Sequence, residues 1–182
     1  MRLFVSADLD GAAAAIEALQ EPLSGLSGVR CTDPEQAHVT ITFLGGGDHG
    51  LDALSTALEE AIHEAETGSF DTTIEGVGAF PSTENIRVIW AGIEAGAAEL
   101  SALHRHVESK TTALGYDEER HDFTPHVTLA RMEHGAEKVA VRRFLDDATP
   151  EVGPIHIEEL QLKESRLTDD GPEYRTVQRF EL

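Results

Sequence analysis

The tripeptide His-Val-Thr occurs twice in this chain, at residues 38–40 and at residues 126–128. Each copy lies in a run whose alternating side chains predict a β-strand. Residues i and i+2 of a strand point to the same face of a sheet, so His38 lies beside Thr40 and His126 lies beside Thr128. If the two strands faced each other, two imidazoles could exchange protons on opposite sides of a substrate, and two hydroxyls could hydrogen-bond what lies between them.

The elements that must position these residues alternate between helical and strand patterns along the chain. Apolar residues at helical spacing predict helices, and alternating runs predict strands. In chain order the predictions are a strand at 1–8, a helix at 11–23, a strand at 36–44, a helix at 51–66, strands at 70–79 and 86–93, a helix at 100–114, a strand at 125–131, a helix at 137–146, and strands at 154–165 and 174–182. Turns are expected at residues 45–47 and 169–172.

The order helix, His-Val-Thr strand, helix, strand, strand therefore occurs twice, which indicates an internal duplication. A chance pair of motifs would have no reason to fall on the matching strand of each repeat. Equivalent positions in duplicated lobes are related by approximate two-fold symmetry, so both motifs can face one site. We therefore expect a single bilobal domain over residues 1–182, with the site between the strands that carry residues 38–40 and 126–128.

The amino-acid composition indicates the surroundings in which the protein works, but not its function. The chain has 182 residues, 34 of them acidic and 14 basic, which gives a net charge of −20. Dispersed acidity of this kind is used by halophiles, so we expect an acidic, halophile-like protein in a salt-rich cytoplasm. The same charge disfavours a broad nucleic-acid surface. No signal peptide and no long apolar run is found in the sequence, so a cytoplasmic location without a membrane partner is expected.

Other chemistries have weaker signatures. The single Cys31 excludes an internal disulfide, and neither Cys-x-x-Cys nor His-Glu-x-x-His occurs. His104 and His106 lie in a helical stretch, where positions i and i+2 do not share a face, so they are not expected to form a metal pair. The glycines at 45–47 lack the Lys-Ser/Thr of a phosphate-binding loop. We expect neither a metal ion nor another cofactor.

The residues around the motifs resemble the two-histidine (2H) phosphoesterases, specifically the RNA 2′,3′-cyclic phosphodiesterases, first described as 2′–5′ RNA ligases. The resemblance runs nearly from end to end. It rests on Arg2–Val5, His38–Ile41, Phe43–Gly45, Phe80-Pro81, Arg87–Gly92, Pro125–Arg131, Glu164–Leu167, Gly171, Tyr174 and Phe180–Leu182. The departures, Ala37 before the first motif and no basic residue between Thr40 and Phe43, do not touch the chemistry. The resemblance implies an α+β fold with two lobes, each an antiparallel sheet with outer helices, around a metal-independent site.

The resemblance also implies an activity, the hydrolysis of RNA 2′,3′-cyclic phosphodiester ends to 2′-phosphomonoesters. His38 would be the proton donor and His126 the proton acceptor, an order that rests on the resemblance because the two motifs are nearly symmetric. Thr40, Thr128 and Arg131 would bind the substrate. Strict alternation from His126 places Arg131 on the opposite face, so it reaches the site only if its strand twists, bulges or ends there. The next candidates for this guanidinium are Arg87, Arg166 and Arg175.

The expected partner is an RNA with a 2′,3′-cyclic phosphate end, tRNA-derived ends being one source, and the protein is expected to act as a monomer. Two alternatives stay open. One is a module that binds RNA ends without turnover, and the other is a phosphodiesterase acting on a small cyclic nucleotide or on ADP-ribose cyclic phosphate. Intact His and Thr pairs in both repeats favour an enzyme over a binding module.

Overall fold

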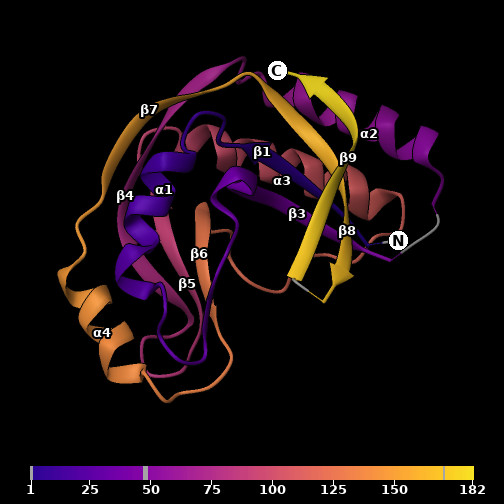
Figure 1. Ribbon diagram of the computed structural model, residues 1–182. Coiled ribbons are helices and arrows are strands. Elements are labelled where there is room, and N and C mark those ends of the chain that lie inside the picture. Colours follow the sequence, from indigo (N-terminus) through magenta and orange to yellow (C-terminus); the bar gives the residue numbers. More distant parts are fainter. Residues whose placement is uncertain (1, 47–48, 170) are drawn as a thin grey trace.

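The computed structural model describes residues 2–46, 49–169 and 171–182 (Figure 1). Within these residues, four α-helices and two short 3₁₀ turns accompany the strands of one sheet. The elements are β1 (Arg2–Asp8), α1 (Ala13–Gln20), η1 (Glu21–Leu23), β2 (Val29–Cys31), η2 (Pro34–Gln36), β3 (His38–Gly45), α2 (Leu51–Ala65), β4 (Phe70–Pro81), β5 (Ile86–Ile93), α3 (Ala97–Ala113), β6 (His126–Met132), α4 (Lys138–Asp147), β7 (Glu151–Ile157), β8 (Glu159–Thr168) and β9 (Gly171–Glu181).

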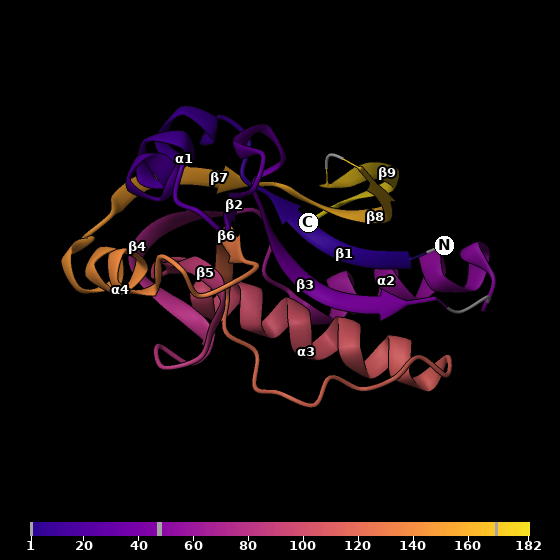
Figure 2. The same ribbon diagram turned by 60° about the horizontal axis from the view of Figure 1, so that its bottom comes forward.

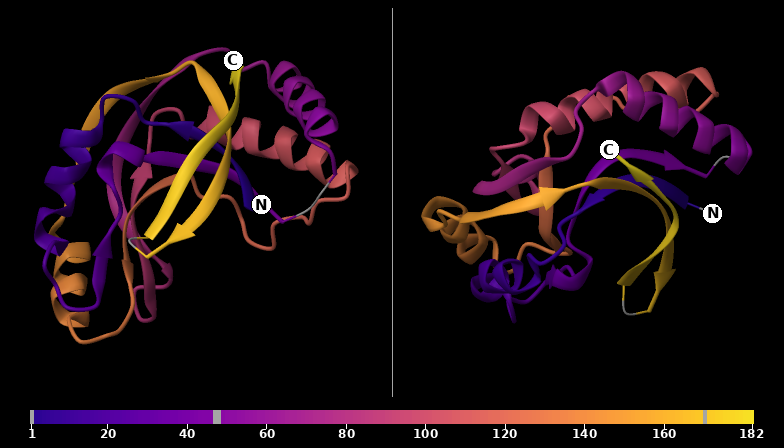
Figure 3. Two further views of the ribbon diagram at one scale, coloured as in Figure 1. Left: turned by 45° about the vertical axis from the view of Figure 1, so that its right-hand side comes forward. Right: turned by 90° about the horizontal axis from the view of Figure 1, so that it is seen from above.

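The strands form a single antiparallel sheet in the order β7-β4-β5-β6-β3-β1-β8-β9, with β2 paired to β6. The helices pack in two groups. α2 and α3 lie side by side, and α3 packs on β3, whereas α1 contacts β6 and α4 contacts β4 (Figure 2). The β8–β9 hairpin curves at one side of the molecule, away from α4 (Figure 3). The α+β class and the antiparallel strand pairing expected from the sequence are therefore confirmed, whereas the division into two lobes, each with its own sheet, stays a prediction.

The two motif strands meet at the centre of this sheet. Among the described residues, β3 and β6 are joined at the pair Val39 with Val127, and their ribbons run in different directions (Figure 1). The segments that follow each motif are exchanged in space, because the β4–β5 hairpin lies beside β6 whereas β8 and β9 extend the β3 side. The helices are exchanged too, since α1 precedes β3 but packs on β6, and α3 precedes β6 but packs on β3. The duplication stays a prediction, and its sequence repeats do not coincide with the two halves of the sheet.

Most of the expected elements lie within a few residues of their predicted bounds, and the differences have local causes. The helix predicted for 11–23 ends at Gln20, because Pro22 cannot continue its hydrogen bonds and residues 21–23 form η1. The strand predicted for 154–165 is two strands, β7 and β8, which pair with β4 and β1 at distant places in the sheet. The short strand β2 was missed. Met1 of the first strand, Gly47 of the first turn and Asp170 of the second lie outside the described residues.

The core lies between the helices and the sheet face that carries the valine of each motif. Val39 and Val127 are each 1% exposed, and burying such a side chain stabilises the fold by about 1.5–3 kcal/mol relative to leaving it exposed. In α3 the buried positions follow helical spacing and are Leu100, Leu103, His104, Val107 and Thr111. This packing holds β3 from behind and leaves its other face for the site. Among the described residues, no helix combines the length and apolar character needed to cross a membrane.

Candidate active site

The register between β3 and β6 brings the two motifs together. The two strands are antiparallel and Val39 pairs with Val127. Continuing that register places His38 opposite Thr128 and Thr40 opposite His126. We call the sheet side that carries these four residues the histidine face.

A β-bulge interrupts the alternation at the same place in each motif strand. In β3 the extra residue is Ile41, because Val5 and Ser6 of β1 pair with Thr42 and Thr40. In β6 it is Leu129, because Ile89 and Trp90 of β5 pair with Ala130 and Thr128. One extra residue shifts the alternation by one, so the residue five positions after the histidine faces the same side of the sheet as the histidine. The bulges therefore turn Phe43 and Arg131, each five residues after its histidine, toward the histidine face.

The main-chain carbonyls of the two bulged residues are satisfied by partners distant in sequence. His104 Nδ1 lies 2.7 Å from the carbonyl oxygen of Ile41 and donates to it, and the buried His104 ring stacks on Phe123 at 4.3 Å. The carbonyl of Leu129 accepts from the side chain of Gln20 at 2.9 Å. It also accepts from the main-chain N–H of Thr32, again at 2.9 Å. His104 thus has a structural contact of its own, on a different side from His106, which faces Glu64 on α2.

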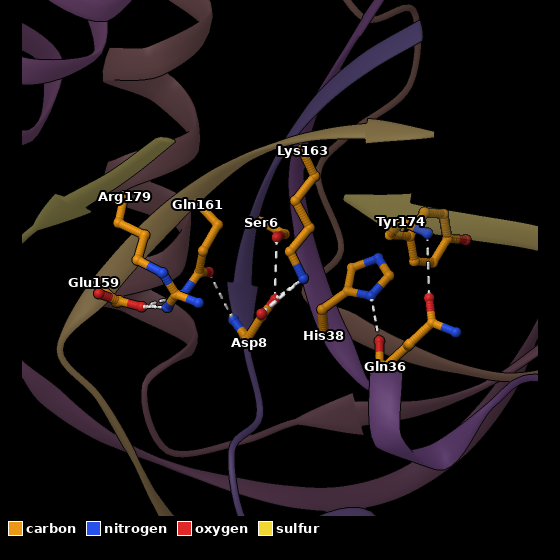
Figure 4. Close-up of polar contacts among 9 residues, drawn as sticks. All are labelled: Ser6, Asp8, Gln36, His38, Glu159, Gln161, Lys163, Tyr174 and Arg179. Atoms are coloured by element: carbon orange, nitrogen blue, oxygen red, sulfur yellow. Dashed lines mark hydrogen bonds and ion pairs between the residues drawn. The ribbon is translucent and has the colours of Figure 1, made fainter. Parts of the chain in front are cut away.

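Both motif histidines are held in the same tautomer. His38 Nδ1 lies 2.8 Å from the main-chain oxygen of Gln36, and His126 Nδ1 lies 2.6 Å from that of Thr124. A carbonyl oxygen only accepts, so Nδ1 carries the hydrogen in each ring. The other nitrogen, Nε2, is left to exchange a proton with a substrate. Figure 4 shows the His38 contact and the link from the Gln36 side chain to the N–H of Tyr174 on β9.

Aromatic rings fix the orientation of each imidazole. His38 lies against Phe4 and Tyr174, with ring centroids 5.4 and 5.2 Å away. His126 lies against Phe80 and Trp90, at 4.9 and 5.9 Å. The Tyr174 and Phe80 rings meet their histidines edge to face, an arrangement favoured by the charge distribution of aromatic rings. The histidines therefore sit on apolar supports that leave few alternative rotamers.

Burial is the largest influence on the pKa of His38, and it lowers that pKa because the charged imidazolium is desolvated. The hydrogen bond to Gln36 raises the pKa, since it favours the protonated ring. Lys163 lowers the pKa, Asp8 raises it, and His126 lowers it. His38 thus lies beside charges of both signs.

The pKa of His126 is shifted by the same kinds of influence, from different residues. Burial again lowers its pKa most, and the hydrogen bond to Thr124 raises it. The guanidinium of Arg131 then lowers the pKa, and the carboxylate of Glu119 raises it. Of these two charges the cation has the larger effect, which favours the neutral imidazole.

Arg131 is the guanidinium that the structure brings to the histidine face. It lies close enough to lower the pKa of His126 and to oppose the rise that burial causes in the pKa of Tyr174. Over residues 2–46, 49–169 and 171–182, neither a hydrogen bond nor an ion pair of its side chain is found. Its charge is available to an anionic ligand.

The other arginines considered from the sequence are placed elsewhere. Val88 and Trp90 pair with Arg131 and Thr128, so they lie on the histidine face. Arg87, the residue before Val88, therefore points to the opposite face of β5. Arg166 and Arg175 bind the carboxylate of Glu164 at 3.2 and 3.0 Å. These ion pairs lie on the face of β8 opposite to Lys163.

The threonines of the motifs offer hydroxyls that nothing else uses. Thr40 and Thr128 are half-buried, and within the described part of the chain no hydrogen bond of either hydroxyl is found. They flank the imidazoles on both sides, as the strand register requires. Together with Arg131 they could bind the non-bridging oxygens of a phosphate group. No three His, Cys, Asp or Glu side chains gather to hold a metal ion in the part of the chain that the structure describes.

Sequence reasoning assigned no role to Phe43, which the bulge at Ile41 turns to the histidine face. Its side chain is 62% exposed, an unusual state for a phenylalanine in a strand, and it touches Phe4 with ring centroids 6.1 Å apart. The available signal was the spacing, because Phe43 follows His38 at the distance by which Arg131 follows His126. An exposed ring on the histidine face offers a stacking surface.

Comparisons with known proteins agree with this architecture. The family described as the 2′-5′ RNA ligase superfamily matches residues 8–166. An RNA 2′,3′-cyclic phosphodiesterase from Archaeoglobus fulgidus is 35% identical over 184 residues, covering 100% of both chains. One from Methanothermobacter thermautotrophicus is 30% identical over 186 residues, covering 100% of this chain and 99% of the relative.

Solved structures show the same fold. The protein TT0787 of Thermus thermophilus superposes with a TM-score of 0.79 at 26% identity, covering 100% of this chain and 98% of that one. Escherichia coli LigT complexed with 3′-AMP superposes with a TM-score of 0.76 at 22% identity, covering 100% and 97%. With the family match spanning most of the chain, this protein belongs to the 2′-5′ RNA ligase superfamily, the 2H phosphoesterases that its two motifs resemble.

Proposed function

We propose that this protein hydrolyses the 2′,3′-cyclic phosphodiester at an RNA end to a 2′-phosphomonoester, without a metal ion. The observation that carries the proposal is the pair of imidazoles on one sheet face, each with Nδ1 bound to a carbonyl and Nε2 left free. The relatives named RNA 2′,3′-cyclic phosphodiesterases, at 30–35% identity over whole chains, support the substrate class.

In the proposed reaction, water attacks phosphorus and the bond to the ribose 3′ oxygen breaks. His126 accepts the proton of the attacking water, and His38 donates its proton to the leaving 3′ oxygen. Thr40, Thr128 and Arg131 hydrogen-bond the non-bridging oxygens, whose negative charge grows in the transition state. After turnover His126 is protonated and His38 is neutral, so exchange with solvent restores the starting state.

This order of donor and acceptor follows the family resemblance. At each ring a cation lowers the pKa more than a carboxylate raises it, Lys163 against Asp8 at His38 and Arg131 against Glu119 at His126. Because one chain supplies both histidines, the site is complete in a monomer, which is the state that we propose. tRNA-derived ends are among the RNA substrates that fit the proposal.

Incubating the purified protein and EDTA with an RNA that ends in a 2′,3′-cyclic phosphate tests the function. We expect a 2′-phosphomonoester, identified by mass and by its resistance to 3′-specific phosphatases. The assay is run at low salt and in molar KCl, where the Debye length falls to about 3 Å and the net charge of −20 no longer repels RNA.

The outcomes of this assay separate the candidates. A 3′-phosphate product would reverse the leaving group, and activity that appeared only with Mg²⁺ or Zn²⁺ would contradict the metal-free mechanism. Binding without conversion would leave an RNA-end binding module. Faster turnover of a nucleoside 2′,3′-cyclic phosphate or of ADP-ribose cyclic phosphate would indicate a small substrate.

The pH dependence of kcat/KM follows from the buried histidines. A donor must be protonated, so activity falls as pH rises through its pKa, and an acceptor must be neutral, so activity falls as pH drops below its pKa. Burial lowers the pKa of both His38 and His126. Both limbs of the bell-shaped profile therefore move to lower pH, and we expect an optimum below about 6.5, the ordinary histidine pKa. A profile with both limbs above neutral pH would contradict the expected burial effect.

Replacing Phe43 with alanine should weaken substrate binding more than chemistry. Stacking of one base on an aromatic ring contributes about 1–3 kcal/mol, so we expect KM to rise by roughly 5- to 100-fold with kcat little changed. Phe43→Trp should keep the wild-type KM. Val139→Ala removes another exposed apolar side chain, on the outer helix α4, and serves as the control. An unchanged KM for Phe43→Ala with an RNA substrate would remove Phe43 from the binding site.

A further inference from the structure

A buried ion pair lies next to His38. Lys163 Nζ on β8 is 2.6 Å from both carboxylate oxygens of Asp8 on β1 (Figure 4). The Lys163 side chain is 7% exposed and that of Asp8 is 19% exposed. Ser6 Oγ donates to the same carboxylate at 3.2 Å, and the N–H of Asp8 donates to Gln161. The carboxylate is therefore fixed in one orientation.

The pair adjoins the imidazole by strand register. Asp8 is the direct partner of His38 in the β1–β3 ladder, and residues in this relation have Cβ atoms about 5 Å apart. Both charges of the pair act electrostatically on His38. Removing two charges from water costs free energy, and apolar residues of similar size often stabilise a fold as well or better. A buried pair beside a titrating ring is thus poorly explained by stability alone.

The second motif has no such pair. The residue that faces His126 in the β5–β6 ladder, at the place of Asp8, is Gly92. A Cβ atom there would lie 2.7 Å from the carbonyl oxygen of Glu75, so a side chain does not fit. The two motifs are nearly identical in sequence, and this position makes their surroundings different. His38 has beside it a carboxylate and an ammonium that are bonded to each other. His126 is influenced by the Arg131 guanidinium and the Glu119 carboxylate, between which no ion pair is found in the described part of the chain.

We propose that the ion pair of Asp8 and Lys163 positions His38 for proton transfer, in which the ammonium favours the neutral imidazole and the carboxylate limits that effect. The other titratable groups that face His38 are Tyr174 from β9 and His126 from β6. Neither group brings two opposite charges to His38, as the Asp8–Lys163 pair does. This inference rests on the proposed function, since it concerns how the protonation of the proposed donor is controlled.

The chemistry requires both members of the pair. A carboxylate without its ammonium would hold the proton of His38 too firmly to deliver it and would repel the substrate phosphate. An ammonium without the carboxylate would keep His38 neutral, so the ring would have no proton to give. A donor is most effective when its proton affinity is close to the working pH, and the two opposed charges keep His38 in that range.

The protonation of His38 can be followed directly by NMR titration of its imidazole nitrogens in the protein without substrate, the signal being assigned from its loss in His38→Gln. Since a charge at 4–6 Å moves a titration by about 1–3 pH units, we expect Asp8→Asn to lower the His38 midpoint by about 1 unit and Lys163→Met to raise it by a similar amount. The double variant should titrate near the wild type. It also keeps the test valid if one single variant does not fold, because it leaves no unpaired charge.

A neighbouring ion pair, with a buried carboxylate and an exposed guanidinium, provides a control. Glu164 and Arg175 interact at 3.0 Å on the opposite face of the same hairpin, so Glu164→Gln and Arg175→Met should leave the His38 titration in place. In rate profiles, Asp8→Asn should move the alkaline limb to lower pH and Lys163→Met should move it to higher pH. An unmoved His38 titration in variants that fold would overturn the role of the pair. If the acidic limb of the rate profile moved instead, His38 would not be the donor. If His38 titrated as expected in every variant but the protein did not convert RNA ends, only the proposed function would be contradicted.

Discussion

Replacing either motif histidine by alanine should lower kcat by about 10²–10⁴-fold, the usual contribution of one general acid or base. His38→Ala removes the donor and should abolish the alkaline limb of the pH–rate profile. His126→Ala removes the acceptor and should abolish the acidic limb. Each ring is tied to a carbonyl by Nδ1, so neither histidine can take over the other's position. Initial rates of cyclic-phosphate opening across pH provide the measurement.

The double variant makes this prediction sharper. Two groups that act as a unit are non-additive, so His38→Ala/His126→Ala should be little slower than the slower single variant. His63, exposed on the outer helix α2, is the control, and His63→Ala should keep wild-type turnover. Thermal melting checks that all variants fold, because both motif rings pack on aromatic neighbours. Near-normal turnover in either single variant would leave that histidine with a structural role only.

The second large effect is expected at Arg131. Arg131→Ala should lower kcat/KM by about 10²–10³-fold, because a donor aimed at transition-state charge is lost. Arg131→Lys should restore only part of this, since an ammonium cannot bind two phosphate oxygens in the planar geometry of a guanidinium. Thr40→Val and Thr128→Val should lower the rate by up to a similar factor while both limbs of the pH profile stay in place.

Arg87→Ala is the matched control for Arg131, because its strand lies next to β6 but its side chain points to the far side of the sheet. It should leave turnover and KM unchanged. If Arg131→Ala had no effect while the threonine variants did, the phosphate would be held by a different cation. A loss of activity in Arg87→Ala with a normal melting temperature would point to that residue.

Much of this protein was predictable from local patterns in its sequence. A two-residue period puts His38 with Thr40, and His126 with Thr128, on one face of a strand whatever the rest of the fold does. Helical spacing likewise predicted the helix that buries Leu100 and Val107. These inferences succeed because side-chain direction in a helix or strand depends only on the neighbouring residues.

The tertiary structure decided the features that depend on partners distant in sequence. Arg131 could not be assigned to the histidine face by alternation, because a bulge at Leu129 exists only where β6 is paired to β5 and where Gln20 satisfies the freed carbonyl. The difference between the two histidines was equally hidden. Asp8 and Lys163 are 155 positions apart and meet only because β1 lies between β3 and β8. The order in which strands pair depends on the burial of the whole sheet, so it cannot be predicted from the local periodicity of the sequence. That order places the Asp8–Lys163 pair beside His38 and not beside His126.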